Sequence, residues 1–171
     1  MSEKFNTEVL IVGTGISGLL AAIKLSERYS VTILSKSSLS DCSTAWAQGG
    51  IAAVIDTKDN FNNHIKDTIN NGHQICNLKS VQQIIKQGKD SIELLLNYGV
   101  NFNKKGKGLD QTLEGGHSHR RIIYHNDNTG EEIHSSLLRE ARKKKNIIIK
   151  ENIMVIDMIG KKENYCEGVY A

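Results

Sequence analysis

The stretch Glu8-Val-Leu-Ile-Val-Gly13-Thr-Gly15-Ile-Ser-Gly18-Leu19 decides the fold of this chain. Its apolar run, residues 8–12, is typical of a central parallel strand that is buried on both faces. The glycines follow with the spacing Gly-x-Gly-x-x-Gly, and residues 16–28 then have helical periodicity. A second apolar strand at residues 31–34 completes a βαβ unit of about 30 residues, which is the size of a dinucleotide-binding unit.

Each glycine of this turn has its own expected task. Gly13 permits a tight turn, Gly15 lets the backbone approach a pyrophosphate, and Gly18 lets the helix pack closely on the strand. The N-terminus of the helix offers unpaired N–H groups to phosphate oxygens. The turn therefore predicts that the chain binds a dinucleotide.

The second strand ends in Leu34-Ser35-Lys36, where an acidic residue would normally accept the hydroxyls of a ribose. Two interpretations are open. A cation here suits the 2′-phosphate of NADP. Alternatively the ligand is FAD, with Ser35 and Lys36 at its adenosine end. The glycine turn does not decide between them.

The rest of the chain continues as a mixed pattern of helices and strands, which predicts an α/β fold with a parallel central sheet and an added β-meander. Residues 37–48 look irregular, and residues 104–108 form a loop or hairpin turn. Helices are expected over residues 60–71, 78–98 and 131–145, and strands over residues 147–149, 153–159 and 168–171. The longest helix has an apolar stripe and Gly99 as its C-cap; the stripe is Val81, Ile84, Ile85, Ile92, Leu95 and Leu96.

Composition narrows the class of protein. The chain has 171 residues, 39% of them hydrophobic, which allows one domain with a core or part of a larger one. A net charge of +3 is too small to indicate nucleic acid, and no run approaches the roughly 20 apolar residues of a membrane span. The widely spaced Cys42, Cys76 and Cys166 suggest free thiols. We expect a cytoplasmic protein with neither nucleic acid nor membrane as partner.

A second motif follows the βαβ unit: Ser43-Thr44-Ala45-Trp46-Ala47-Gln48-Gly49-Gly50-Ile51-Ala52. Two hydroxyls, an amide and adjacent glycines let a backbone press against a flat ring system and hydrogen-bond its edge. The alternative is a surface loop. Trp46 and the apolar run after it argue against that alternative.

On these motifs the sequence resembles the succinate dehydrogenase/fumarate reductase flavoprotein family, and within it the L-aspartate oxidases. The resemblance runs from about residue 8 to 160 and includes Glu114-Gly115-Gly116-His117-Ser118-His119-Arg120-Arg121-Ile122 and Asp127-x-Thr129-Gly130. Ser-Lys is typical of the family at the position of Ser35-Lys36, so the resemblance removes the NADP interpretation. Membrane-complex members carry a histidine that bonds covalently to FAD, and the matching position here is Ser43. The resemblance therefore implies non-covalent FAD.

The same resemblance implies which residues contact FAD, with a backbone contact to the adenine near Met154 and Val155. The full set is Gly13, Thr14, Gly15, Ile16, Ser17, Gly18, Ser35, Lys36, Ser43, Thr44, Ala45, Trp46, Ala47, Gln48, Gly49, Gly50, Met154 and Val155.

The resemblance also implies a dicarboxylate site at residues 114–117. Glu114 would discriminate aspartate through its amino group, since a carboxylate pairs well with an ammonium. Leu113 departs from the pattern, because many relatives have a basic residue there. His117 is expected in an anion-binding or flavin-edge wall, and Arg120 and Arg121 are weaker candidates for the same role. The alternative for these residues is a solvated loop.

No metal site is expected, because His117-x-His119 lacks a third ligand with metal spacing and the neighbouring arginines repel a cation. The other histidines, His64, His73, His125 and His134, are expected at the surface.

The implied reaction is the oxidation of L-aspartate to iminoaspartate, with hydride passing to the flavin and with oxygen or fumarate as acceptor. In the family the product goes to quinolinate synthase, in the first steps of NAD biosynthesis. In the family, the main catalytic arginine and histidines come from a capping domain that follows the segment matched here. Residues 1–171 are therefore expected to be the N-terminal part of the FAD-binding domain, without capping and C-terminal helical domains, and inactive alone. The alternatives are a fumarate reductase or succinate dehydrogenase type of flavoprotein, and a non-catalytic remnant.

Overall fold

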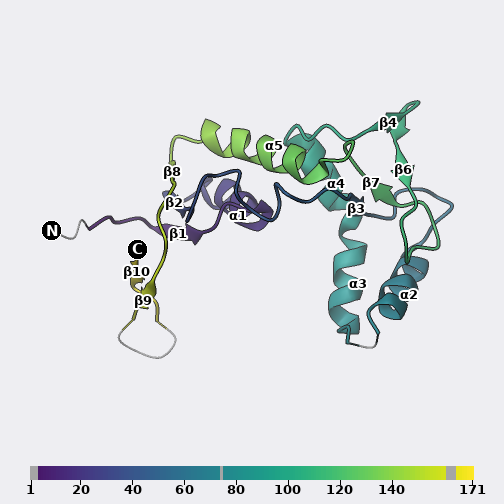
Figure 1. The fold of residues 1–171 in the computed structure, drawn as a ribbon, viewed down its shortest axis with the longest axis horizontal. Helices are drawn as coiled ribbons and strands as arrows, with labels where there is room; N and C mark the ends of the chain where they lie inside the picture. The colour runs from purple at the N-terminus through teal and green to yellow at the C-terminus, as the bar shows by residue number, and fades with distance from the viewer. Residues whose placement is uncertain (1–3, 74, 161–164) are drawn as a thin grey trace. The chain divides into compact units, whose positions relative to one another are not determined.

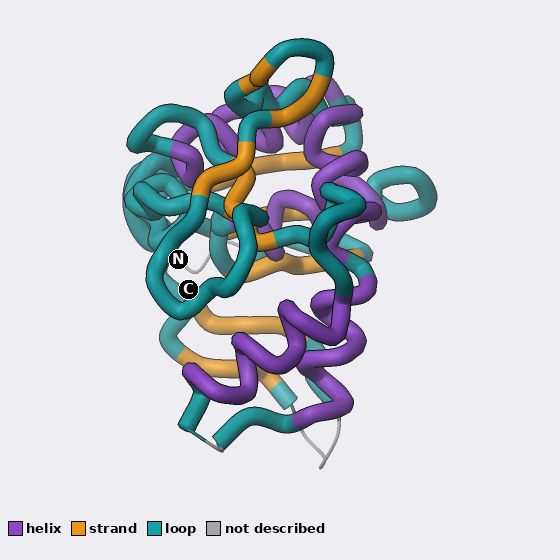
Figure 2. Tube along the Cα trace, turned by 90° about the vertical axis from the view of Figure 1, so that its right-hand side faces the viewer, coloured by secondary structure: helices purple, strands orange, loops and turns teal. Residues whose placement is uncertain are grey.

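The computed structural model describes residues 4–73, 75–160 and 165–171 (Figure 1). The chain folds as two compact units. The first unit combines residues 1–46 with residues 133–171, and the second unit is residues 47–132. Figure 2 shows how much of the chain is loop, and the predicted functional motifs lie largely in these loops.

The first unit has a parallel sheet of three strands in the order β1-β2-β8: β1 (Val9–Val12), β2 (Val31–Leu34) and β8 (Ile147–Lys150). Helix α1 (Ile16–Leu25) joins β1 to β2, which confirms the βαβ unit. The expectation that β1 is central was wrong. All four residues of β2 are buried, whereas β1 pairs on one side only among the described residues and leaves Val12 60% exposed.

The core of the first unit lies where helices meet this sheet. Leu19, Ala22 and Ile23 of α1 are buried because they recur on one helical face. Helix α5 (Thr129–Lys143) leads into β8 and buries a second stripe, Ile133, Leu137 and Ala141. A buried Leu or Ile contributes about 1.5–3 kcal/mol relative to an exposed one, so both stripes stabilise the first unit.

The added strands at the end of the chain, β9 (Asp157–Ile159) and β10 (Gly168–Tyr170), pair antiparallel with each other. The expected strand over residues 153–159 begins only at Asp157. Residues 153–156 have no regular structure, and the Ile153 N–H donates to the Ser35 carbonyl, 2.9 Å away.

The second unit has a small antiparallel sheet in the order β3-β7-β6: β3 (Ile51–Ala52), β7 (Ile122–Ile123) and β6 (Gln111–Thr112). Strands β4 (Lys104–Lys105) and β5 (Gly108–Leu109) form the hairpin that was one of the two predictions for this region. Helices α2 (Phe61–Asn71) and α3 (Leu78–Lys86) lie side by side (Figure 1). Asn60 and Asn77 cap them by accepting backbone N–H groups.

The helix predicted over residues 78–98 is interrupted. It divides at Gln87 into α3 and α4 (Gly88–Asn97). The start of α4 lies close to β3, since a Cβ on Gly88 would be 3.4 Å from the Ala53 Cβ. Within the expected stripe, Ile85, Ile92 and Leu95 are buried, but Ile84 is 70% exposed because the break changes the face that α3 presents. Gly99 ends α4 with φ +82°, as expected of a C-cap glycine.

Candidate functional site

The glycine turn between β1 and α1 has the geometry that its spacing predicts. Gly13 has φ +105°, a conformation that side chains rarely adopt, and its N–H donates to the Leu34 carbonyl at 2.8 Å. A Cβ on Gly18 would lie 2.2 Å from the Gly13 carbonyl oxygen, so no larger residue fits there. The first turn of α1 therefore lies directly against the end of β1.

Three predicted cofactor segments meet at this turn. The Thr44 hydroxyl accepts a hydrogen bond from the Ile16 N–H at 3.0 Å, which brings residues 43–46 to the N-terminus of α1. The buried Thr14 hydroxyl lies 3.4 Å from that of Ser35 at the end of β2. The carboxyl ends of parallel strands are where ligands bind in open α/β sheets, so this edge is the candidate cofactor site.

A fourth segment joins them through the backbone of Ser35. The Ser35 N–H donates to Lys150 at the end of β8, and its carbonyl accepts from Ile153, each at 2.9 Å. Met154 and Val155 follow directly at the same edge. The first unit thus brings together residues 13–18, 35–36, 43–46 and 154–155 from four separate stretches of chain.

Exposure differs among the predicted cofactor residues. Thr14 and Ser35 are buried, whereas Ser17, Lys36, Ser43, Met154 and Trp46 are exposed. Contrary to expectation, Trp46 lies in a surface loop: its side chain is 74% exposed in a stretch without helix or strand. The rest of the second motif, residues 47–50, belongs to the second unit. There a Cβ on Gly50 would lie 2.4 Å from the Ile123 carbonyl oxygen, so close packing of β3 on β7 requires this glycine.

Sequence reasoning did not predict the burial of His134, which was expected at the surface but is only 3% exposed. It lies on the buried stripe of α5 and hydrogen-bonds to the backbone of Thr14 in the glycine turn. Burial lowers the pKa of His134 by more than this hydrogen bond raises it. The helical spacing of His134 with Leu137 and Ala141 was the signal that places it inside.

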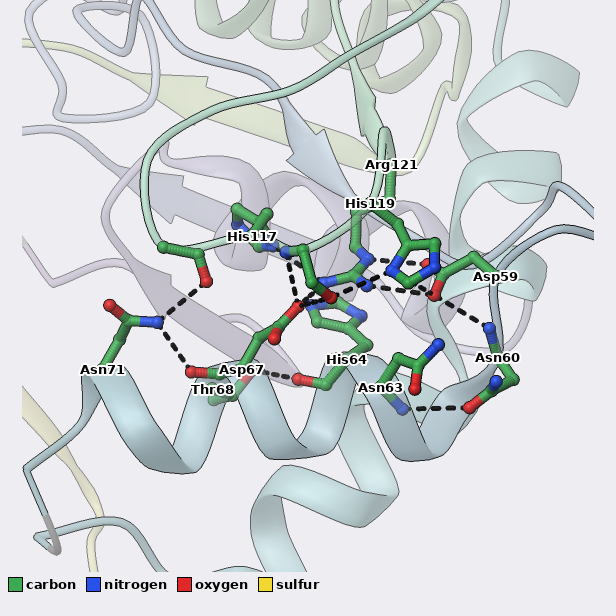
Figure 3. Close-up of polar contacts among 12 residues, drawn as sticks. Asp59, Asn60, Asn63, His64, Asp67, Thr68, Asn71, His117, His119 and Arg121 are labelled. Carbon is green, nitrogen blue, oxygen red and sulfur yellow. Dashed lines mark hydrogen bonds and ion pairs between the residues drawn. The ribbon is translucent and has the colours of Figure 1, made fainter.

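The second unit holds a cluster of polar side chains around Arg121, between α2 and residues 114–121 (Figure 3). Arg121 has no exposed surface. Its Nε and Nη2 donate to the two carboxylate oxygens of Asp59, at 2.7 and 3.0 Å, and its Nη1 donates to Asp67 at 2.6 Å. Arg121 is therefore paired internally, which corrects its assignment to an anion-binding or flavin-edge wall.

These pairs change the pKa values of all three groups. Burial would raise the pKa of the Asp59 carboxyl, but the Arg121 hydrogen bonds, the Asn60 N–H and the charge of Arg121 together outweigh it, and the pKa is lowered. Burial would likewise raise the pKa of the Asp67 carboxyl. Hydrogen bonds from the Ser118 N–H, Arg121 and the Ser118 hydroxyl outweigh this effect and lower the pKa to about 2. Burial would lower the pKa of Arg121, and the two carboxylates raise it instead.

Three histidines surround the ion pair of Arg121 and Asp59. The His117 Nδ1 lies 3.1 Å from the Arg121 Nη1, and the His119 Nδ1 lies 3.6 Å from Asp59. His64 is 5% exposed, contrary to expectation, and its ring centroid is 5.6 Å from that of His117. Burial, followed by the charges of Arg121 and His117, lowers the pKa of His64.

Glu114 and Gly115 lie on the exposed side of the same stretch. The Glu114 carbonyl accepts from the His117 N–H at 3.2 Å, so the residues form a turn. Sequence reasoning did not find Asp59 or Asp67. Polar residues at helical spacing on α2, His64, Asp67 and Asn71, were the available signal.

Two classes of site or segment are not found. The described residues contain no group of three His, Cys, Asp or Glu side chains placed to hold a metal ion. None of the described helices combines the length and the apolar character that crossing a bilayer demands.

The known proteins that this chain resembles have the type of fold described above. Residues 8–171 match the family described as FAD binding domain. The chain is 44% identical to the L-aspartate oxidase of Acinetobacter baylyi, over 89% of this chain and 28% of that enzyme. It is 41% identical to that of Clostridium acetobutylicum, over 96% of this chain and 38% of that enzyme.

Solved structures show the same architecture. Quinol fumarate reductase FrdA of E. coli superposes with a TM-score of 0.90 at 23% identity, covering 98% of this chain and 29% of that one. The Sdh1 complex of Mycobacterium smegmatis gives a TM-score of 0.89 at 25% identity, covering 98% of this chain and 31% of that one. The chain spans roughly a third of the length of these proteins. It belongs to the family of FAD-binding domains, and the curated relatives named here are L-aspartate oxidases.

Proposed function

We propose that residues 1–171 form the N-terminal part of the FAD-binding domain of an enzyme that oxidises L-aspartate to iminoaspartate. The observation that carries this proposal is the meeting of the glycine turn, Ser35, Thr44 and residues 153–155 at the carboxyl edge of the parallel sheet. The similarity to L-aspartate oxidases supports the choice of substrate.

The residues at this edge fit an adenine dinucleotide. The N-terminus of α1 and the turn of residues 13–18 would face the pyrophosphate. Ser35, Lys36, Met154 and Val155 would face the adenosine end, and residues 43–50 the flavin end. Ser43 offers a hydroxyl and no imidazole, so the proposed attachment is non-covalent. When bound, FAD supplies the hydride acceptor of the reaction.

The turn that contains Glu114 would form one wall of the substrate site. The Glu114 carboxylate would pair with the ammonium of L-aspartate, and His117 would donate a hydrogen bond within the same wall. Turnover also needs an arginine and histidines that we assign to a capping domain, which together with a C-terminal helical domain would account for the greater length of the relatives. Fumarate or oxygen would be the electron acceptor, and quinolinate synthase would use the product.

A cytoplasmic location accompanies this proposal. It is supported by Cys42, Cys76 and Cys166, which are all free thiols, as is usual in a reducing compartment.

The test of the proposal is flavin binding by the chain itself. We expect weak binding of FAD, measured by quenching of flavin fluorescence, and at least about tenfold weaker binding for Gly18→Ala, since its Cβ would collide with the Gly13 carbonyl. Gly108→Ala is the matched control, because a Cβ there meets nothing within 4 Å. Circular dichroism checks that each variant is folded. Equal FAD affinity of Gly18→Ala and the parent chain would contradict the proposed site.

Addition of L-aspartate without oxygen tests whether residues 1–171 contain a complete catalytic site. The FAD-loaded chain should leave the flavin absorbance unchanged, because the proposed catalytic arginine and histidines lie outside residues 1–171. Bleaching of the flavin by L-aspartate would show that the site is already complete. A fumarate reductase or succinate dehydrogenase type of flavoprotein is the second candidate, favoured by the superposition on FrdA. A change in the absorbance of the bound flavin with succinate, and none with L-aspartate, would favour it.

A further inference from the structure

The turn of residues 114–118 is tied to one side of helix α2 (Figure 3). Asp67 is the centre of this connection. A single carboxylate oxygen of Asp67 accepts the Ser118 N–H at 2.9 Å, the Ser118 hydroxyl at 2.8 Å and the Arg121 Nη1 at 2.6 Å. Two of these donors belong to the last residue of the turn, so Asp67 fixes where the turn ends.

Asn71, one helical turn after Asp67, holds the middle of the same segment. Its amide donates to the Gly116 carbonyl and to the Asp67 carbonyl, each at 2.8 Å. Gly116 has φ +81°, and a Cβ there would lie 2.8 Å from the Asn71 amide oxygen. The backbone of the turn therefore lies directly against the side chain of Asn71.

Arg121 connects the cluster to His117. The guanidinium has only donors, so at 3.1 Å the Nδ1 of His117 has to accept its hydrogen bond. The proton of the uncharged His117 ring then lies on Nε2. The orientation of Arg121 is itself fixed by Asp59, which binds it through two hydrogen bonds.

We propose that Asp67, Asn71 and Arg121 are positioning residues for the substrate wall. Asp67 and Asn71 hold the 114–118 turn on α2, and Arg121 selects the tautomer of His117, so that Nε2 is the hydrogen-bond donor. The inference rests on the proposed function, in which Glu114 and His117 face L-aspartate. None of the three positioning residues contacts the substrate in this proposal.

Amide hydrogen exchange of the 171-residue chain, followed by NMR, tests the two contacts on α2. Asn71→Ala removes the bond to Gly116 while alanine favours the helix, so the chain should remain folded. We expect exchange at the His117 and Ser118 amides to rise about tenfold, as the loss of one hydrogen bond predicts. Exchange at the central strand β2 should be unchanged.

A graded series separates positioning from general stability. Asp67→Asn keeps an acceptor oxygen but removes its charge, and Asp67→Ala removes both. Exchange at the Ser118 amide should therefore increase from the parent chain to Asp67→Asn and again to Asp67→Ala. Glu93→Gln is the matched control, because it removes a carboxylate from an exposed ion pair on α4 that does not touch the turn. Unchanged exchange at Ser118 in all variants, or an equal rise in β2, would overturn the inference.

The tautomer of His117 gives a readout that loss of stability does not imitate. Nitrogen-15 shifts of the imidazole at about pH 8 should show a protonated Nε2 in the parent chain and a mixture of tautomers in the double variant Arg121→Met with Asp59→Asn, which lacks the donor to Nδ1 and leaves no unpaired buried carboxylate at Asp59. The exposed His73 is the internal reference. A protonated Nδ1 on His117 in the parent chain would overturn the role of Arg121. These measurements use neither flavin nor substrate, so their failure is distinct from a failure of the chain to bind FAD.

Discussion

A fully buried arginine is stable only if its charge is matched inside the protein. Arg121 meets this condition through Asp59, whose side chain is 2% exposed, and through Asp67, whose side chain is 14% exposed. The bonds to Arg121 help to lower the pKa of both carboxylates, and at Asp67 the Ser118 N–H lowers the pKa further. Removing one partner therefore leaves a charge that is both enclosed and unpaired.

The first prediction concerns this pair. Arg121→Met should lower the free energy of unfolding by about 3–5 kcal/mol, because Asp59 is left uncompensated. The double variant Arg121→Met with Asp59→Asn should be less destabilised, since the buried carboxylate is then neutral. Urea denaturation measures both. Lys89→Met, which removes the cation of an exposed pair, should change stability by no more than about 0.5 kcal/mol. Equal losses for Lys89→Met and Arg121→Met would contradict this account.

The second prediction concerns His64 and His134, whose pKa values burial lowers from the ordinary 6.5. At a pH between the pKa of the folded state and that of the unfolded state, the unfolded chain binds more protons. The contribution of the two uncharged histidines to the free energy of unfolding is therefore fully present above about pH 6.5, and it is lost as the pH falls below that value. His64→Gln and His134→Gln should each flatten the dependence of the urea midpoint on pH below about pH 6.5. His73→Gln, at an exposed position, should leave it as it is. Asp67 contributes to a separate loss, between pH about 4 and 2.

Single residues also show what the sequence can and cannot predict. Gly13 and Gly18 were assigned correctly because their tasks follow from neighbours within one turn. Arg121 and His64 were not, because their burial depends on partners elsewhere in the chain. Arg121 and Asp59 are 62 positions apart, and no local pattern joins them.

At the scale of elements, the helical periodicity of the sequence predicts that a helix is present better than it predicts that the helix is uninterrupted. The helix of residues 60–71 was placed within one residue, because Asn60 is a strong N-cap. The helix of residues 78–98 was expected to be continuous, yet Gly88 approaches Ala53 and the chain turns at Gln87. Similarly, the apolar run of β1 gave no indication that it lies at the edge of the described sheet. Tertiary contacts decide both features.

The third prediction concerns the junction of β3 and β7. Gly50→Ala should lower the midpoint of thermal unfolding, because its Cβ would lie 2.4 Å from the Ile123 carbonyl and 2.6 Å from the Ile122 side chain. Such overpacking typically costs about 1–3 kcal/mol. The neighbouring Gly49→Ala is the control, since a Cβ there meets nothing within 4 Å. Calorimetry compares the two, and equal midpoints would show that β3 moves away from β7 without cost.

At the scale of the whole molecule, the chain leaves many apolar side chains exposed. Met154, Ile156, Met158 and Tyr170 gather in the segment of β9 and β10 and are each at least 60% exposed. The chain also spans only about a third of the length of its relatives. Exposed apolar side chains that gather in one segment promote association.

The fourth prediction follows from this surface. The 171-residue chain should self-associate as its concentration rises, and Ile156→Lys with Met158→Lys should reduce this tendency without changing the thermal midpoint. Light scattering and sedimentation measure the association. Gln83→Lys with Asn97→Lys, which adds the same two charges at exposed polar positions on α3 and α4, tests for an effect of charge alone. Association that is equal in all three chains would exclude the β9–β10 segment as its cause.

The pairing of Arg121 with Asp59 also has a kinetic consequence. Closing a loop of 62 residues costs roughly 4 kcal/mol of chain entropy before any contact compensates for it. Helices α2 and α3 need only local contacts and form far sooner. We therefore expect the ion pair of Arg121 with Asp59 to form after the local contacts of the helices. Until that late step Arg121 remains hydrated, so the polar cluster reports the completion of folding.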